Sequence, residues 1–185
     1  MSKVDIPEGQ IGNYKIEKFI TDRTDFHSFL RKRTVPLGQQ FTRLTKNNSI
    51  IMSDTPAECN DHSYFIHITK GNILIAGLGI GYVLQEVAKK DNVTHITVVE
   101  ISSEVIQLVW SYYKDKFGDK IEIVNADILE WKPPKGIKYD CAWYDIWNDI
   151  CLDNYDDMKK LHRKFAKRVM NYQGCWSREY LKSHR

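Results

Sequence analysis

The chain has 185 residues, of which 42% are apolar and 28% charged, and its formal net charge is +3. A chain of this size and composition can bury a core as one compact domain, so disordered and fibrous proteins are excluded. The longest uncharged apolar stretch, residues 73–84, is too short to span a bilayer, and the first residues begin no apolar run, so we expect neither a membrane span nor a secretory signal. The four cysteines are far apart and form no C-x-x-C pair, so we expect a reducing cytoplasm rather than a zinc ribbon or a disulfide scaffold.

Residues 1–70 are predicted to form a small β-rich segment ahead of the main domain. Short stretches rich in β-forming or apolar residues lie at 11–20, 40–44, 49–53 and 64–68. Lys46-Asn47-Asn48 is a turn candidate between two of them, and residues 31–36 are expected in a loop. We therefore expect an antiparallel β element here.

From residue 71 to the end the pattern becomes regular and predicts a second, larger unit. Four short apolar runs occur at 73–76, 96–99, 121–124 and 141–144. Residues 82–90 and 104–117 lie between them and carry apolar residues at helical spacing, and Ser102 is a suitable N-cap for the second helix. Strands that alternate with helices at this period predict an α/β fold with a doubly wound, mainly parallel sheet.

The C-terminal part is predicted to hold one helix and little else. Residues 156–170 have helical spacing, and the last fifteen residues offer at most a short strand at 174–176, so the sheet is expected to be truncated. An incomplete sheet edge would favour a homo-oligomer. From residue 159 onward there are nine lysines and arginines and a single acid. This asymmetry is compatible with contact with nucleic acid or a protein, although a solvated helix face is the simpler explanation.

A glycine-rich turn follows the first apolar run and precedes a helix. It reads Gly77-Leu78-Gly79-Ile80-Gly81. Glycines at this point let the backbone bend sharply and approach a ligand. A dinucleotide-binding turn would place its third glycine at position 82, which is Tyr82 here. The turn therefore departs from the dinucleotide signature, and a tight turn without a ligand remains the alternative.

Acidic residues end the second and third predicted strands. Glu100 ends the second, where a carboxylate can accept hydrogen bonds from both hydroxyls of a ribose. Asp127 ends the third, where it can accept from an exocyclic amine such as that of adenine or cap a helix instead. Polar side chains and aromatic rings follow the fourth strand, at the edge where open α/β sheets bind ligands: Tyr144, Asp145, Trp147, Asn148 and Asp149.

Together these motifs resemble the class I S-adenosylmethionine-dependent methyltransferases, which have a Rossmann-like fold, and within them the polyamine (spermidine) synthase branch. The glycine turn is similar to the first family motif, and VVEIS (98–102), NAD (125–127) and YDCAWYD (139–145) are similar to the next three. Residues 53–62 loosely resemble the β-hairpin region that precedes the fold in polyamine synthases. The chain as a whole is also similar to short methyltransferase-like proteins of bacteriophages. The resemblance implies these cofactor-binding residues: Gly77, Leu78, Gly79, Gly81, Glu100, Ile101, Asp127 and Ile128.

The resemblance implies an enzyme that passes the methyl group of S-adenosylmethionine to an acceptor that the sequence does not identify. Asp145 would orient or deprotonate the acceptor, and we expect the substrate contacts from Tyr144, Trp147, Asn148 and Asp149. Three alternatives stay open: aminopropyl transfer from the decarboxylated cofactor, binding of cofactor or nucleic acid without catalysis, and a nicotinamide cofactor. Polyamine synthases carry an acid where this chain has Asn148, and they continue for another hundred or so residues. His62 and His67 are too isolated to predict a metal site.

Overall fold

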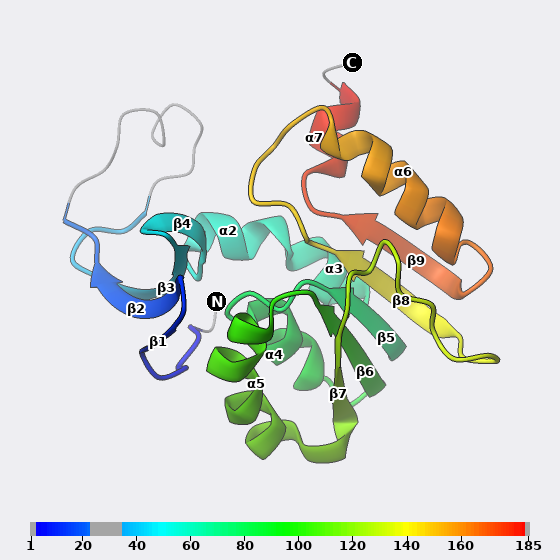
Figure 1. Cartoon of the computed structure of the whole chain (residues 1–185), viewed down its shortest axis with the longest axis horizontal. Coiled ribbons are helices and arrows are strands. Elements are labelled where there is room, and N and C mark those ends of the chain that lie inside the picture. Colours follow the sequence, from blue (N-terminus) through cyan, green and yellow to red (C-terminus); the bar gives the residue numbers. More distant parts are fainter. Residues whose placement is uncertain (1–2, 23–34, 184–185) are drawn as a thin grey trace.

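The computed structural model describes residues 3–22 and 35–183, and it contains two β-sheets with helices packed around them (Figure 1). Most of the loop expected at 31–36 lies outside the described residues. Among the residues that are described, no helix has the length and apolar character needed to cross a membrane.

The N-terminal sheet is antiparallel, as expected from the alternating stretches. Its strands are β1 (Gly9–Ile11), β2 (Tyr14–Ile20), β3 (Gln40–Lys46) and β4 (Ser49–Ser53), in that spatial order. Asn47 and Asn48 connect β3 to β4 with φ angles of 51° and 64°. Two consecutive residues with positive φ are typical of a tight hairpin turn, so the turn prediction is confirmed.

Residues 53–68 are mostly helical, which corrects two strand predictions. Helices α2 (Pro56–Asp61) and α3 (Ser63–Ile68) replace the β-hairpin suggested for 53–62 and the apolar strand suggested for 64–68. The buried positions His62, Phe65 and Thr69 are three and four residues apart. That spacing is the period of a helix, and the dense apolar run had concealed it.

The second sheet is a five-stranded parallel sheet in the order β7-β6-β5-β8-β9. Its strands are β5 (Gly71–Ala76), β6 (Val93–Glu100), β7 (Ile121–Asn125), β8 (Tyr139–Tyr144) and β9 (Val169–Cys175). The connecting helices are α4 (Tyr82–Ala88), α5 (Ser103–Phe117), the short η1 (Gly118–Lys120) and α6 (Asn154–Phe165), and α7 (Arg178–Ser183) follows the last strand. The doubly wound α/β prediction is confirmed.

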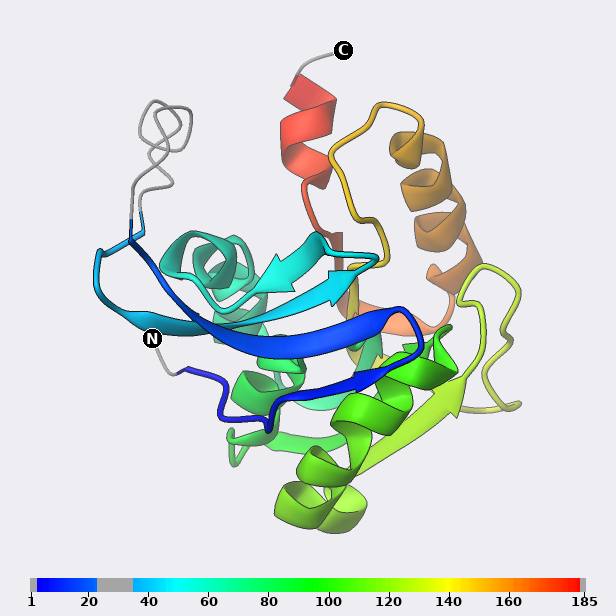
Figure 2. The same ribbon diagram turned by 60° about the vertical axis from the view of Figure 1, so that its left-hand side comes forward.

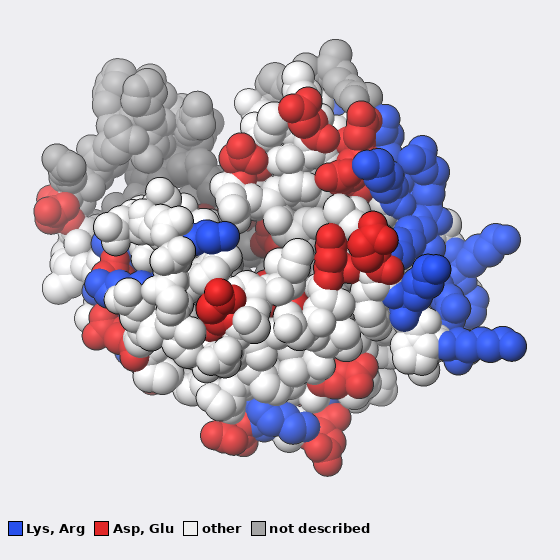
Figure 3. Space-filling model, viewed as in Figure 1, with Lys and Arg blue, Asp and Glu red and all other residues white. Residues whose placement is uncertain are grey.

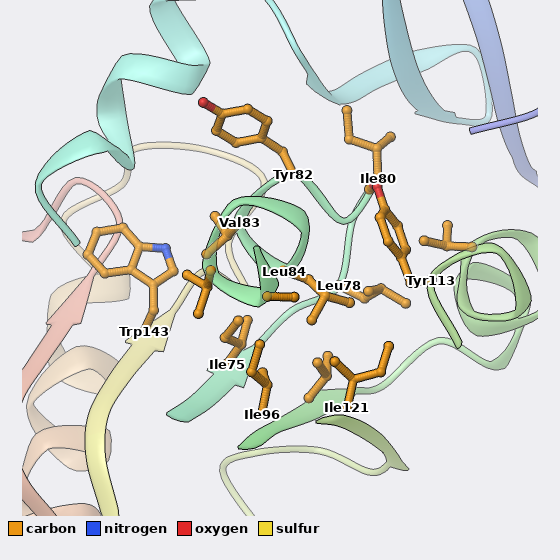
Figure 4. Packing of buried hydrophobic residues seen from close by; sticks show 14 of the residues in the cluster. Ile75, Leu78, Ile80, Tyr82, Val83, Leu84, Ile96, Tyr113, Ile121 and Trp143 are labelled. Atoms are coloured by element: carbon orange, nitrogen blue, oxygen red, sulfur yellow. The ribbon is translucent and has the colours of Figure 1, made fainter. Parts of the chain in front are cut away.

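Alternate residues of the central strands face two separate cores. Ile73 and Ile75 of β5 pack with α4 and α5, whereas Leu74 and Ala76 pack with α6 on the other face. Figure 4 shows the first core, where side chains from α4, α5 and the sheet meet. The Ser102 hydroxyl accepts the backbone N–H of Val105 at 3.2 Å, which confirms the predicted N-cap of α5.

The C-terminal elements differ from the prediction in extent. Helix α6 ends at Phe165 instead of residue 170, and β9 has seven residues instead of the three expected at 174–176. Val169 pairs with Tyr139 of β8, so the chain must leave the helix before it to enter the sheet. The basic residues that follow Phe165 made residues 166–170 resemble the solvent-facing side of a helix.

Candidate functional site

A cavity of about 410 Å³ lies at the carboxyl ends of the central parallel strands. The N-terminal sheet closes one side of it, with β1 running along α5 (Figure 2). Ten of the residues singled out in the sequence line this cavity: Gly77, Leu78, Gly79, Glu100, Ile101, Asp127, Ile128, Asp145, Trp147 and Asn148. The fold therefore gathers residues from four separate strand ends, as expected where the crossovers of an open α/β sheet diverge.

Glu100 lies at the end of β6 and joins two segments of the cavity wall. The residue is only 8% exposed, and its two carboxylate oxygens accept backbone N–H groups from different segments. Oε2 accepts from Leu78 at 2.7 Å and Oε1 accepts from Ser102 at 2.8 Å. Each oxygen of an ionised carboxylate has a second acceptor position. Glu100 can therefore hold the glycine turn and still accept hydroxyl groups from a ligand.

The glycines of the turn are required by contacts within the protein. Gly77 has a φ of +91°, and a Cβ there would lie 2.0 Å from the carbonyl oxygen of Asp145. Gly81 has a φ of +75°, and a Cβ there would lie 2.1 Å from the ring of Tyr113. Gly81 is not among the residues that line the cavity: it is the N-cap of α4 and makes room for Tyr113.

Asp127 has a local structural role in addition to its position at the cavity. Its Oδ1 accepts the backbone N–H of Leu129 at 2.8 Å, so the side chain stabilises the turn after β7. The sequence left open a helix-capping role for this Asp, but residues 128–130 form a turn and not a helix. The second carboxylate oxygen, Oδ2, is the atom available for a ligand amine.

The acidity of Asp145, which lines the cavity, is strongly altered by its surroundings. Burial raises the pKa of its carboxyl from 3.8 to about 7, with smaller contributions from the negative charges of Glu58 and Asp61. The side chain keeps 22% of its accessible surface, and its Oδ2 lies 3.8 Å from Nε2 of His62. Its backbone N–H donates to the carbonyl of Ala76 at 2.9 Å, which fixes it beside the glycine turn. A carboxyl with this pKa exchanges a proton near neutral pH, as a general base must.

Two residues predicted to contact the substrate lie outside the cavity. Tyr144 is fully buried on the opposite face of the sheet, where its ring centroid is 5.7 Å from that of Phe165 and its hydroxyl donates to Gln173 at 3.2 Å. Its neighbour Trp143 faces the cavity instead, because successive residues of a strand point to opposite faces. Asp149 is exposed and its Oδ1 accepts from Asn154 at the start of α6, at 3.2 Å.

The N-terminal sheet contributes cavity residues that the sequence did not predict: Tyr14, Leu44, Lys46, Ile51 and Met52. The Met52 sulfur accepts the backbone N–H of Ile80 at 3.2 Å, so β4 rests directly on the glycine turn. The Lys46 ammonium lies 5.0 Å from the ring centroid of Tyr14. No motif marks these residues, and only the docking of one sheet against the other brings them to the site.

The residues around the cavity suit an organic ligand better than a metal ion. In the part of the chain that the structure describes, no group of three His, Cys, Asp or Glu side chains could hold a metal. The cavity instead offers three carboxylates at strand ends, those of Glu100, Asp127 and Asp145, together with an exposed Ile101 and the Trp147 indole. Polar groups that converge within a largely apolar wall are typical of a small-molecule site.

Comparison with known proteins gives a family and a fold. The family model described as the spermine/spermidine synthase domain matches residues 60–177, which include every cavity residue outside the N-terminal sheet. No curated protein matches the chain.

Solved structures are similar at low sequence identity. The CcbJ methyltransferase of Streptomyces caelestis is 16% identical with a TM-score of 0.50, and the alignment covers 62% of this chain and 46% of that one. An S-adenosylmethionine-dependent methyltransferase of Clostridium acetobutylicum is 15% identical with a TM-score of 0.45, covering 60% and 43%. The chain thus spans less than half the length of these proteins. The likeness to the CcbJ methyltransferase supports the Rossmann-like fold.

Proposed function

This chain belongs to the spermine/spermidine synthase domain family, and on that basis we propose that its cavity binds S-adenosylmethionine and serves methyl transfer to an acceptor. The observation that carries the proposal is the position of Glu100 beside the glycine turn, with acceptor positions left on both carboxylate oxygens. Similar solved proteins include ones described as S-adenosylmethionine-dependent methyltransferases and ones in complex with S-adenosylhomocysteine. Both ligands contain a ribose that Glu100 could hold.

In this proposal each strand end contacts one part of the cofactor. Glu100 accepts the ribose hydroxyls, and Asp127 accepts the adenine amine through Oδ2. Ile101 and Ile128 cover the faces of the base. The backbone of Gly77, Leu78 and Gly79, which lines the cavity, lies along the methionine part.

The chemical step needs little covalent work from the protein. S-adenosylmethionine held by Glu100, Asp127 and the glycine turn would supply an electrophilic methyl group, and the electron pair of the broken carbon–sulfur bond would stay on the sulfur of S-adenosylhomocysteine. The protein mainly holds donor and acceptor in line. Asp145 takes the proton that the acceptor loses, which requires the ionised carboxylate, and Trp147 and Asn148 border the same space.

Calorimetric titration with S-adenosylhomocysteine tests the binding part. We expect Glu100→Gln to weaken binding about a hundredfold, because two charge-assisted hydrogen bonds contribute about 1.5–3 kcal/mol each. Glu130→Gln is a matched control, since Glu130 is exposed and does not line the cavity. Undiminished affinity in Glu100→Gln would contradict the ribose assignment.

Aminopropyl transfer is a second candidate, with which the family match agrees only weakly. The carboxylates of Asp145 and Asp61 are close enough for the charge of Asp61 to raise the pKa of Asp145, so a cationic amine would find negative charge there. Incubation with putrescine and decarboxylated S-adenosylmethionine separates the two reactions. Absence of a polyamine product would exclude aminopropyl transfer. Transfer of a methyl group from S-adenosylmethionine would support the first candidate, methyl transfer.

We also propose a reducing, cytoplasmic setting for the reaction. All four cysteines are free thiols, and three of them are buried. Burial raises the pKa values of the Cys59, Cys141 and Cys175 thiols, so these groups resist oxidation and pack as small apolar side chains.

A further inference from the structure

Lysine and arginine side chains gather on one flank of the molecule, away from the cavity. Figure 3 shows them over α6 and the connection between β7 and β8. We call this surface the basic face and define it by seven residues: Lys132, Lys135, Lys138, Arg163, Lys164, Lys167 and Arg168. Among the residues that the structure describes, none of the seven forms an ion pair. Lys159 and Lys160 differ, since each pairs with an acid one turn earlier in α6.

The basic face differs from the basic tail suggested by the sequence. Three of its lysines come from residues 132–138, which the sequence did not associate with the C-terminal charges. The terminal helix α7 is not part of it: Arg178 and Lys182 both lie within ion-pair distance of Glu179. The fold therefore concentrates positive charge that is spread over about 40 residues of sequence, whereas the two cations of α7 share one acid, Glu179.

Hydrogen bonds hold the two halves of the basic face together. The Lys164 ammonium donates to the carbonyls of Ile128 and Leu129 at 2.9 and 2.6 Å. The Arg168 guanidinium donates to the carbonyls of Pro134 and Ile137 at 3.2 and 2.9 Å. These contacts fix the β7–β8 connection against α6 and the turn that follows it. The two segments that carry the cations are thus fixed relative to each other. The cations nevertheless repel one another.

We propose that the basic face binds the phosphate backbone of double-stranded nucleic acid without reading its sequence. Neutralisation of phosphates and release of their counterions would overcome the repulsion among the seven cations. The only aromatic residue in the two segments, residues 132–138 and 163–168, is Phe165, which is completely buried. Proteins that bind single strands rely on exposed rings on which bases stack, whereas the ring of Trp131, next to Lys132, is partly buried and stacks on Phe165. A duplex, which presents phosphates on its outside, fits this chemistry better.

Fluorescence anisotropy with a labelled 20-base-pair duplex tests the proposal on the full chain. With about five phosphate contacts, affinity should fall on the order of 500-fold between 50 and 200 mM salt. A scrambled duplex should bind equally well, and a single strand of the same length more weakly. Failure to bind the duplex at 50 mM salt, or a flat salt response, would overturn the proposal. So would preference for the single strand, or binding to phosphatidylserine vesicles without binding to the duplex.

A charge-reversal variant locates the contact. Lys135→Glu, Arg163→Glu and Lys167→Glu change three exposed side chains that make no hydrogen bond with another described residue, so the fold should persist, and circular dichroism checks this. We expect at least about a 30-fold loss of affinity at 100 mM salt and a salt slope reduced by about 3. The control carries the same charge change elsewhere: Lys70→Glu, Lys116→Glu and Lys182→Glu.

Equal losses in the two triple variants would show that net charge alone drives binding and would refute the assignment to the basic face. If the first variant fails to fold, Lys132→Glu with Lys135→Glu reverses two charges of the β7–β8 connection alone. That variant should still reduce the salt slope by about 2.

Discussion

Replacing Asp145 with asparagine should stabilise the protein at alkaline pH and leave it almost unchanged in acid. The carboxyl has a pKa of about 7 in the folded protein, against 3.8 when it is exposed. Below pH 3.8 both states hold the proton, and between the two values only the folded state does. The unfolded state therefore gains relative stability as the pH rises through this range. A difference of about three pKa units corresponds to about 4 kcal/mol, since each unit is worth 1.36 kcal/mol.

Urea denaturation at pH 4.5 and pH 8 measures this effect. The amide introduced by Asp145→Asn carries no charge, so the variant avoids the cost of ionising a buried group. We expect the difference in unfolding free energy between variant and wild type to grow by about 3 kcal/mol from pH 4.5 to pH 8. Other titrating groups contribute equally to both proteins and cancel. A difference that does not change with pH would show that burial does not perturb this carboxyl, and its role as a base near neutral pH would be lost with it.

Three other positions give predictions that stability and binding measurements can check. Gly77→Ala should lower the unfolding free energy by more than about 2 kcal/mol, because the new Cβ would clash with the Asp145 carbonyl and the residue has a positive φ. An unchanged thermal melt would contradict this. Tyr144→Phe should lower the unfolding free energy by about 1 kcal/mol, because the hydrogen bond to Gln173 is lost, and should leave the affinity for S-adenosylhomocysteine unchanged. A weaker affinity by calorimetry would show that Tyr144 contributes to the binding site. Burial and the charge of Arg178 lower the pKa of His162 to about 4, so the wild type should lose stability as the pH falls from 6.5 toward 4, and His162→Gln should lose less over that range in urea denaturation.

The parallel sheet could be predicted because its sequence signal is local. Each central strand is an apolar run flanked by an amphipathic helix, and Ser102 marks a helix start that the structure reproduces. The segments at 53–68 and 166–170 were predicted wrongly for the opposite reason. The apolar or basic residues of these segments fit both the helical and the strand period. Packing of Phe65 against Trp143 selects the helix in the first segment, and pairing of Val169 with Tyr139 selects the strand in the second.

The cavity residues could be predicted as far as they follow a strand end. Glu100 and Asp145 stand at such ends, where the topology of a parallel sheet fixes their location whatever else the chain does. Tyr144 also lies at a strand end, but the face of the sheet on which its side chain lies depends on the alternation along β8. The run of apolar residues concealed this alternation. Met52 and Lys46 could not have been found, since their place depends on how two sheets dock.

The hydrogen bond that the Leu78 amide donates to Glu100 affects how quickly a ligand associates. The glycine turn is already hydrogen-bonded to the neighbouring strand in the absence of a ligand, so this turn does not have to be ordered when a ligand binds. A receptor that is already shaped in this way gives fast association, and differences among its ligands then show chiefly in how long each stays bound. For the proposed ligands, S-adenosylmethionine and S-adenosylhomocysteine would then differ mainly in their dissociation rates.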